Sequence, residues 1–269
     1  MSNRIAAKFK ALASRGECAL VCYVVAGYPD LKASEVAIDC LVAGGADIIE
    51  LGVPFSDPLA DGQTIQAASH SALEKGVTPE KALQLAKRVR KRHPNLPLLA
   101  MTYCNILVRV GVEKFMTHAK ECGIDGFILP DMPLDEAGEY LHAAEKLDLS
   151  IVFLASPNTP EERLKKMLKS TSGFLYLISV YGITGARKSF EDYTVNAIKN
   201  AKRLAGLMPV AVGFGIKTPS HVRLMKVAGA DGVIIGSAII DIMSKPSGKI
   251  KMARELFGFA KSMKRACKK

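Results

Sequence analysis

Eight short apolar runs recur along this chain, and an amphipathic stretch follows each of them. The runs are Ala19–Ala26, Asp47–Gly52, Pro97–Thr102, Gly126–Pro130, Ser150–Ala155, Gly173–Ser179, Pro209–Gly213 and Gly232–Gly236. Most are β-branched or otherwise apolar at nearly every position, which is typical of strands buried on both faces. Helical periodicity follows in Lys32–Val42, Ile65–Arg92 in two pieces, Val112–Glu121, Leu134–Leu147, Pro160–Lys169, Asp192–Leu204, Pro219–Val227 and Lys249–Arg265. Eight successive strand–helix units predict an α/β fold, a single-domain (β/α)8 TIM barrel over residues 1–269.

Two further helices are expected outside the repeat. Apolar residues at Ile5, Phe9 and Leu12 have helical spacing, so the chain should begin with an extra N-terminal helix. A short helix is expected after the eighth strand, from Gly236 onwards. An open doubly wound sheet is the alternative architecture, but it usually carries G-x-G-x-x-G after its first strand, and this chain has Val25-Ala-Gly-Tyr-Pro29 there.

The charge and cysteine content limit the classes of partner. The net charge of +11 gathers mainly at 87–92 and 261–269, which we interpret as solvated helix faces, with nucleic-acid or acidic-surface contact as the alternative. A positive field also favours an anionic small-molecule substrate. The six cysteines form no C-x-x-C pair and are interpreted as reduced, and no run reaches 18 apolar residues. We therefore expect a cytoplasmic protein with neither a membrane span nor nucleic acid as partner.

In a barrel of this kind the chemistry lies at the carboxyl ends of the strands. None of the eight runs contains lysine, which excludes a Schiff-base lysine on a strand. The five histidines fall in expected helices or their loops, away from metal-ligand spacing, so no metal site is expected. Carboxylates remain, and the second run supplies them.

The second strand reads Asp47-Ile-Ile-Glu-Leu-Gly52, and its period of two turns Glu50 into the barrel. Burial there should raise the pKa of Glu50 into the range that is useful for proton transfer. The alternative is a Glu50 neutralised by a structural partner. Asp57 and Asp61 follow on a proline-stiffened loop, and Asp57 is equally well explained as a turn or cap residue.

Two glycine-rich strand ends indicate a phosphate site. Gly213-Phe-Gly-Ile-Lys217 follows the seventh strand and Gly236-Ser-Ala238 follows the eighth. Glycines allow backbone amides to approach an anion, and these two loops are the usual phosphate cradle of barrel enzymes. We therefore expect a phosphorylated substrate. The loop at 180–188, punctuated by two glycines, is predicted to act as a lid.

The segment from Glu50 to Gln66, Glu-Leu-Gly-Val-Pro-Phe-Ser-Asp-Pro-Leu-Ala-Asp-Gly-Gln-Thr-Ile-Gln, closely resembles the signature of the tryptophan synthase alpha subunit family. The similarity extends over nearly the whole chain, through Ala26–Asp30, Leu129–Pro133, Gly182–Gly185 and the two glycine-rich ends. The resemblance implies a lyase of tryptophan biosynthesis that cleaves indole-3-glycerol phosphate, by a retro-aldol reaction, to indole and glyceraldehyde 3-phosphate. Departures are Gln63, where bacterial members commonly have proline, and Val180-Tyr181 in the lid.

The resemblance also implies roles for single residues. Glu50 matches the catalytic acid/base, and Asp61 matches the second catalytic carboxylate, which accepts the indole N–H. The substrate-binding positions that match are Tyr23, Tyr176, Thr184, Gly185, Gly215, Gly236 and Ser237. No cofactor is implied in this subunit, since pyridoxal phosphate is expected only in the partner beta subunit of an alpha2-beta2 heterotetramer. The stretches Pro54–Asp61 and Tyr181–Lys188 should carry part of that interface.

Two other functions remain open from the residues alone. A phosphosugar isomerase or epimerase would share the glycine cradle, although the apolar residues Tyr23, Met101 and Ile128 favour a pocket that accepts an indole. A non-catalytic regulatory subunit would have no need of Glu50 and Asp61, and this chain has both.

Overall fold

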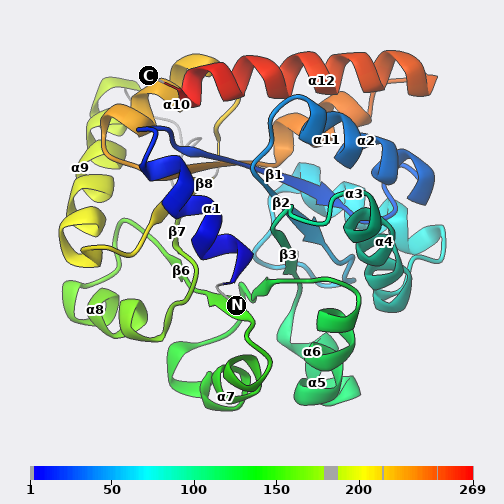
Figure 1. Cartoon of the computed structure of the whole chain (residues 1–269), viewed down its shortest axis with the longest axis horizontal. Coiled ribbons are helices and arrows are strands. Elements are labelled where there is room, and N and C mark those ends of the chain that lie inside the picture. The colour runs from blue at the N-terminus through cyan, green and yellow to red at the C-terminus, as the bar shows by residue number, and fades with distance from the viewer. Residues whose placement is uncertain (1–2, 179–186, 214, 247, 269) are drawn as a thin grey trace.

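The computed structural model describes residues 3–178, 187–213, 215–246 and 248–268, and within them the strands form one parallel sheet enclosed by helices (Figure 1). The strands follow one another in the order β5-β4-β3-β2-β1-β9-β8-β7-β6. The edge strands β5 and β6 are neighbours in the chain, separated only by Phe153. The single segment 150–155 therefore pairs with β4 through its first half and with β7 through its second, which closes the sheet into a barrel. The predicted (β/α)8 fold is confirmed.

The strands are β1 Ala19–Val25, β2 Ile48–Gly52, β3 Leu98–Met101, β4 Gly126–Ile128, β5 Ser150–Val152, β6 Leu154–Ala155, β7 Leu175–Ile178, β8 Val210–Gly213 and β9 Gly232–Ile235. The helices of the repeat are α2 Leu31–Ala43, α3 Gln63–Glu74, α4 Pro79–Arg92, α6 Val112–Glu121, α7 Gly138–Lys146, α8 Glu161–Ser170, α9 Arg187–Ala205, α10 Pro219–Val227 and α12 Gly248–Cys267. Outside the repeat lie α1 Arg4–Ala13, α5 Cys104–Val110, the 3-10 turn η1 Leu134–Glu136 and α11 Ser237–Met243. Among the described residues, none of these helices has both the length and the apolar character that crossing a bilayer requires.

Each predicted run contains a strand, and both extra helices, α1 and α11, are present. Two helical predictions need correction. The stretch Leu134–Leu147 begins as a 3-10 turn and becomes the helix α7 only from Gly138. The helix α5 was not predicted, because its sequence Cys-Asn-Ile-Leu-Val-Arg-Val is short and rich in β-branched residues, which favour strands.

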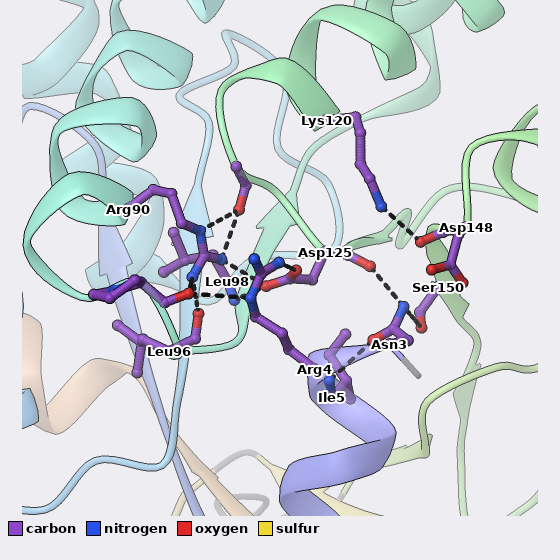
Figure 2. A network of polar contacts seen from close by, with 12 residues as sticks. Asn3, Arg4, Ile5, Arg90, Leu96, Leu98, Lys120, Asp125, Asp148 and Ser150 are labelled. Carbon is purple, nitrogen blue, oxygen red and sulfur yellow. Dashed lines mark hydrogen bonds and ion pairs between the residues drawn. The ribbon is translucent and has the colours of Figure 1, made fainter. Parts of the chain in front are cut away.

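The amino-terminal end of the barrel is held by a buried carboxylate, Asp125, which Figure 2 shows between two arginines. Arg4, from α1, lies 2.7 Å from its Oδ1, and Arg90, from α4, lies 2.7 Å from its Oδ2. The side chain of Asn3 donates to the carbonyl oxygen of Asp125 and to Ser150 Oγ. These contacts fix α1 against the starts of β4 and β5, so the end of the barrel opposite the strand carboxyl ends is closed.

The Asp125 contact is one of three equivalent contacts around the barrel. In each, the aspartate directly before a strand accepts a hydrogen bond from the N–H of a residue on the neighbouring strand. The same aspartate donates its own N–H to the carbonyl oxygen of that residue. The pairs are Asp47 with Leu20, Asp125 with Leu98 and Asp231 with Val210, at N···O distances of 2.7–2.9 Å. A lysine or arginine balances each carboxylate. The strand register is therefore pinned at the amino-terminal end, away from the site described next.

Candidate active site

A pocket of about 600 Å³ opens at the carboxyl ends of the strands. Its position follows from the lining: Met101 and Ile178 are the last residues of β3 and β7, and Gly236 follows β9 directly. The lining residues are Tyr23, Glu50, Asp61, Gly62, Gln63, Thr64, Ile65, Met101, Leu154, Tyr176, Ile178, Gly215, Ile216, Lys217, Ile234, Gly236 and Ser237. Apart from Glu50, Asp61 and Lys217 these side chains are uncharged, so the pocket suits a ligand with an apolar body and a few polar groups.

Glu50 lies on the inner face of β2, where the alternation of the strand predicts it. Its Cα is in register with Tyr23 on β1 and Leu99 on β3, and its side chain is 1% exposed. Its Oε2 has no hydrogen-bond partner among the described residues. Burial, followed by the charge of Asp61, raises the pKa of Glu50 to about 8, so that the carboxyl group is mostly protonated at neutral pH. Among the residues that the structure describes, none forms an ion pair with Glu50.

Asp61 lies on the loop between β2 and α3 and is half-buried. The hydroxyl of Tyr103, two residues beyond β3, donates to its Oδ2 over 3.1 Å, and the N–H of Ala60 donates to the same hydroxyl over 3.2 Å. The Tyr103 ring stacks on Phe55 from the same loop, with the centroids 5.0 Å apart. Desolvation raises the pKa of Asp61 to about 6, while the hydrogen bond from Tyr103 opposes that rise. At neutral pH Asp61 is therefore largely ionised.

Tyr23 and Tyr176 are buried and line the pocket from β1 and β7. Each hydroxyl lies over a glycine at the end of the next strand along the chain. A Cβ atom at Gly52 would be 2.1 Å from Tyr23 Oη, and one at Gly213 would be 2.3 Å from Tyr176 Oη, so only glycine leaves room for either ring. Burial and the two carboxyl groups raise the pKa of both tyrosines well above the usual value, which keeps them neutral.

The glycine-rich ends lie at the same pocket. Gly215, Gly236 and Ser237 line it together, and Gly215 has a φ of 76°, a backbone conformation that favours glycine. Within the described part of the chain, no loop or cap hydrogen bond uses the amide N–H of any of these three residues. The pocket that holds two carboxyl groups is thus also lined by three residues whose amide N–H groups remain available as donors.

Other predicted residues lie elsewhere. Thr184 and Gly185, with the rest of the predicted lid up to residue 186, lie outside the described residues. Asp57 does not line the pocket, and its Oδ2 accepts a hydrogen bond from Ser56, in line with the turn interpretation. Ile128, expected to shape an indole pocket, is fully buried and absent from the lining. Leu154 and Ile234 provide apolar surface instead.

Two residues at the site were not predicted from the sequence: Tyr103, which contacts Asp61, and Lys217, which lines the pocket. Tyr103 supports Asp61 from a position 42 residues further along the chain, and a spacing of that length carries no local pattern. Lys217 was visible inside the glycine-rich motif but was not singled out. Among the described residues, no group of three or more histidine, cysteine, aspartate or glutamate side chains is placed to hold a metal ion.

A (β/α)8 barrel with two carboxyl groups of different pKa and a glycine-rich lining in one pocket at the strand carboxyl ends has the architecture of a barrel enzyme. The particular family follows from comparison with known proteins. The sequence model of the tryptophan synthase alpha chain family matches residues 9–268. The chain belongs to that family.

Relatives and solved structures agree with this assignment. The tryptophan synthase alpha chain of Methanothermobacter thermautotrophicus is 48% identical over 84% of this chain and 83% of its own length. The alpha chain of Arabidopsis thaliana is 41% identical over 96% of this chain and 93% of its own. The crystal structure of tryptophan synthase subunit alpha from Legionella pneumophila matches with a TM-score of 0.91 and 31% identity, covering 99% of each chain. A chain of the tryptophan synthase complex from Pyrococcus furiosus matches with a TM-score of 0.83 and 36% identity, over 93% of this chain and 98% of the other.

Proposed function

We propose that Glu50 and Asp61 divide the two catalytic tasks of a retro-aldol cleavage that converts indole-3-glycerol phosphate to indole and glyceraldehyde 3-phosphate. Membership in the family assigns the chain the alpha-subunit role in tryptophan biosynthesis, which is that of a carbon–carbon lyase. The observation that carries the residue roles is the pair of carboxyl groups in one pocket with pKa values of about 8 and about 6. At neutral pH one of them can donate a proton while the other holds a negative charge.

The proton inventory of the reaction fits this pair. Protonated Glu50 donates to the indole ring carbon that carries the glycerol chain, and the ring becomes positively charged. The carbon–carbon bond then breaks as the adjacent hydroxyl becomes the aldehyde of glyceraldehyde 3-phosphate. Glu50, now a carboxylate, takes up the hydroxyl proton and is ready for another turnover. Ionised Asp61 accepts the indole N–H and stabilises the positive charge while it exists.

The remaining site residues bind and orient the substrate in this proposal. Tyr23 and Tyr176 form the walls around the indole, and the amides of Gly215, Gly236 and Ser237 bind the phosphate. Thr184 and Gly185 are proposed to complete the site from the lid, with Thr184 meeting Asp61 and Gly185 binding the phosphate. The carbon–carbon cleavage needs only proton transfers and charge stabilisation from the protein, so we propose that this subunit needs no cofactor.

The partner is the tryptophan synthase beta subunit, in keeping with the complexes among the structural matches, and the beta subunit is the one that carries pyridoxal phosphate in this family. We propose that Pro54–Asp61 and Tyr181–Lys188 contribute to the interface in an alpha2-beta2 heterotetramer. In the first of these stretches Leu59 is 92% exposed, an apolar side chain that a partner would bury. We place the reaction in the cytoplasm, in line with the six free cysteines.

The interface proposal predicts that binding of the beta subunit slows amide hydrogen exchange at Pro54–Asp61. The exposed helix α8 on the other side of the barrel serves as an internal reference and should exchange at an unchanged rate. Equal exchange of the loop with and without the beta subunit would place the interface elsewhere.

The proposed chemistry is tested by indole release from indole-3-glycerol phosphate. The wild-type chain should release indole, and Glu50→Gln should reduce turnover about 10²–10⁴-fold, since the amide neither donates nor accepts the transferred proton. Asp61→Asn should also lower turnover but leave more residual activity, because an amide oxygen still accepts the indole N–H. Near-normal turnover of a folded Glu50→Gln variant would exclude this mechanism, and an isomerase would release no indole at all.

A further inference from the structure

The pocket contains one cationic side chain, Lys217, among its described lining residues. The substrate brings a phosphate group of about two negative charges into a pocket that already holds ionised Asp61. Backbone amides carry only partial positive charge and so offset part of this negative charge. A positively charged group within reach of the amides would offset it.

The residues on either side of Lys217 fix the position of its backbone. It follows Gly215 by two residues, so its Cα lies within about 7 Å of the Cα of that glycine. The intervening Ile216 is 2% exposed and anchors the loop in the core. On the other side, Thr218 caps the helix α10 by accepting the N–H of His221, and the N–H of Lys217 itself points to His221 Nδ1 over 3.4 Å. The backbone of Lys217 is thus held while its side chain stays exposed at the pocket.

The ammonium group of Lys217 is not committed to another contact. Within the described ranges the ammonium group has no ion pair or hydrogen bond, and the one such contact of Lys217 is that of its backbone N–H with His221. Lysines elsewhere on the barrel are used differently: Lys264 binds Glu17 and Asp47, and Lys202 binds Asp231. An unpaired lysine at the glycine-rich end of an anion-binding pocket is therefore available for a ligand.

We infer that Lys217 binds the phosphate group of the substrate through its ammonium group, next to the amides of Gly215, Gly236 and Ser237. This inference rests on the proposed function and adds a charged side chain to its phosphate site. Lysine binds as a flexible point charge, so it can follow the phosphate while the amides set its position. The role is one of binding, and the proton transfers stay with Glu50.

The test compares Lys217→Gln with Arg223→Gln. Arg223 is exposed on the helix α10, which begins two residues after Lys217, contacts only Ser220 among the described residues and does not line the pocket. Both variants remove one positive charge, so a loss of long-range attraction affects them equally. Enzyme activity is measured in the reverse direction, from indole and glyceraldehyde 3-phosphate, because the two substrates then report separately on the two ends of the pocket.

We expect Lys217→Gln to raise KM for glyceraldehyde 3-phosphate about tenfold, with KM for indole and kcat changed less than twofold. Arg223→Gln should leave both KM values and kcat near those of the wild type. Added salt should reduce the difference between the two variants in KM for glyceraldehyde 3-phosphate. If the wild type is active but the two variants have the same KM for glyceraldehyde 3-phosphate, the inference about Lys217 is overturned. If the wild type neither forms nor consumes indole, the proposed function itself fails.

Discussion

Replacing Glu50 by glutamine should stabilise the fold in a pH-dependent way. Glu50 is 1% exposed, and its pKa rises from the ordinary 4.5 to about 8 on folding. Between these two values the unfolded chain has lost the proton and the folded chain retains it. The folded state therefore binds more protons, and wild-type stability falls by about 1.4 kcal/mol per pH unit in this window. Glutamine does not titrate, so the unfolding free energy of the variant does not fall for this reason as the pH rises.

The magnitude follows from the width of that window. Relative to wild type, Glu50→Gln should gain about 3 kcal/mol by pH 7 and about 5 kcal/mol above pH 8, measured from the difference at pH 4.5 or below. That low-pH difference is a constant offset, since it contains only the cost of burying an amide in place of a neutral carboxyl group. The slope between pH 5 and pH 8 is thus independent of how well the glutamine packs.

Guanidinium unfolding of both proteins at several values from pH 5 to pH 9 measures this slope. Glu145 is exposed on α7, and Glu145→Gln is the matched control, since its side chain is solvated in the folded and unfolded states. The control should differ from wild type by an amount that is independent of pH. A flat difference for Glu50→Gln as well would refute the reasoning, because it would mean that Glu50 ionises in the folded protein as it does in water.

Two further predictions concern the pocket and the opposite end of the barrel. The plot of kcat/KM against pH should be bell-shaped, rising near pH 6 as Asp61 ionises and falling near pH 8 as Glu50 loses its proton. In Tyr103→Phe the rising limb should move to higher pH, because the hydrogen bond that is lost lowers the pKa of Asp61 in the wild type. A rising limb at the same pH as in the wild type would contradict the assignment of that limb to Asp61. Asp125→Asn should cost about 3 kcal/mol of unfolding free energy, because it removes the buried carboxylate that pairs with Arg4 and Arg90. Asp231→Asn should cost less unfolding free energy, since the Asp231 side chain is 32% exposed and that of Asp125 is 3% exposed. The kcat of both folded variants should equal that of the wild type. Equal losses of unfolding free energy, measured in urea, would show that burial of the aspartate does not determine the cost of replacing it.

The barrel itself was predictable because eight strand–helix units recur with strands apolar on both faces, and because the G-x-G-x-x-G usual in the alternative doubly wound sheet does not follow the first strand. Its closure was not. The run Ser150–Ala155 is continuous in sequence, and the break at Phe153 arises only because its two halves pair with different neighbours, β4 and β7. Hydrophobic periodicity reports which residues are buried and carries no information about which strand each one contacts.

The candidate site divides in the same way. Glu50 could be placed from the alternation of a single strand, and the glycines from their position at two strand ends. Tyr103 could not, because its role depends on a loop 42 residues earlier that turns Asp61 toward it. The helix α5, which begins at Cys104, was missed for a related reason: its seven residues are too few to show a helical period.

The three short motifs that place an aspartate before a strand show how far a repeated pattern can be interpreted. The motifs are Ala43-Gly-Gly-Ala-Asp47, Cys122-Gly-Ile-Asp125 and Ala228-Gly-Ala-Asp231, and the sequence indicates only that they recur in equivalent loops between a helix and a strand. In the structure each aspartate joins its strand to a neighbour by the same pair of hydrogen bonds, but the balancing cations come from unrelated helices: α12 for Asp47, α4 with α1 for Asp125, and α9 for Asp231. The backbone contact repeats because the strand–helix unit repeats, whereas the charge balance depends on which helix happens to pass nearby. Rigidity at this end leaves the loops at the opposite end free to differ, and those loops carry Asp61, Gly215 and Lys217.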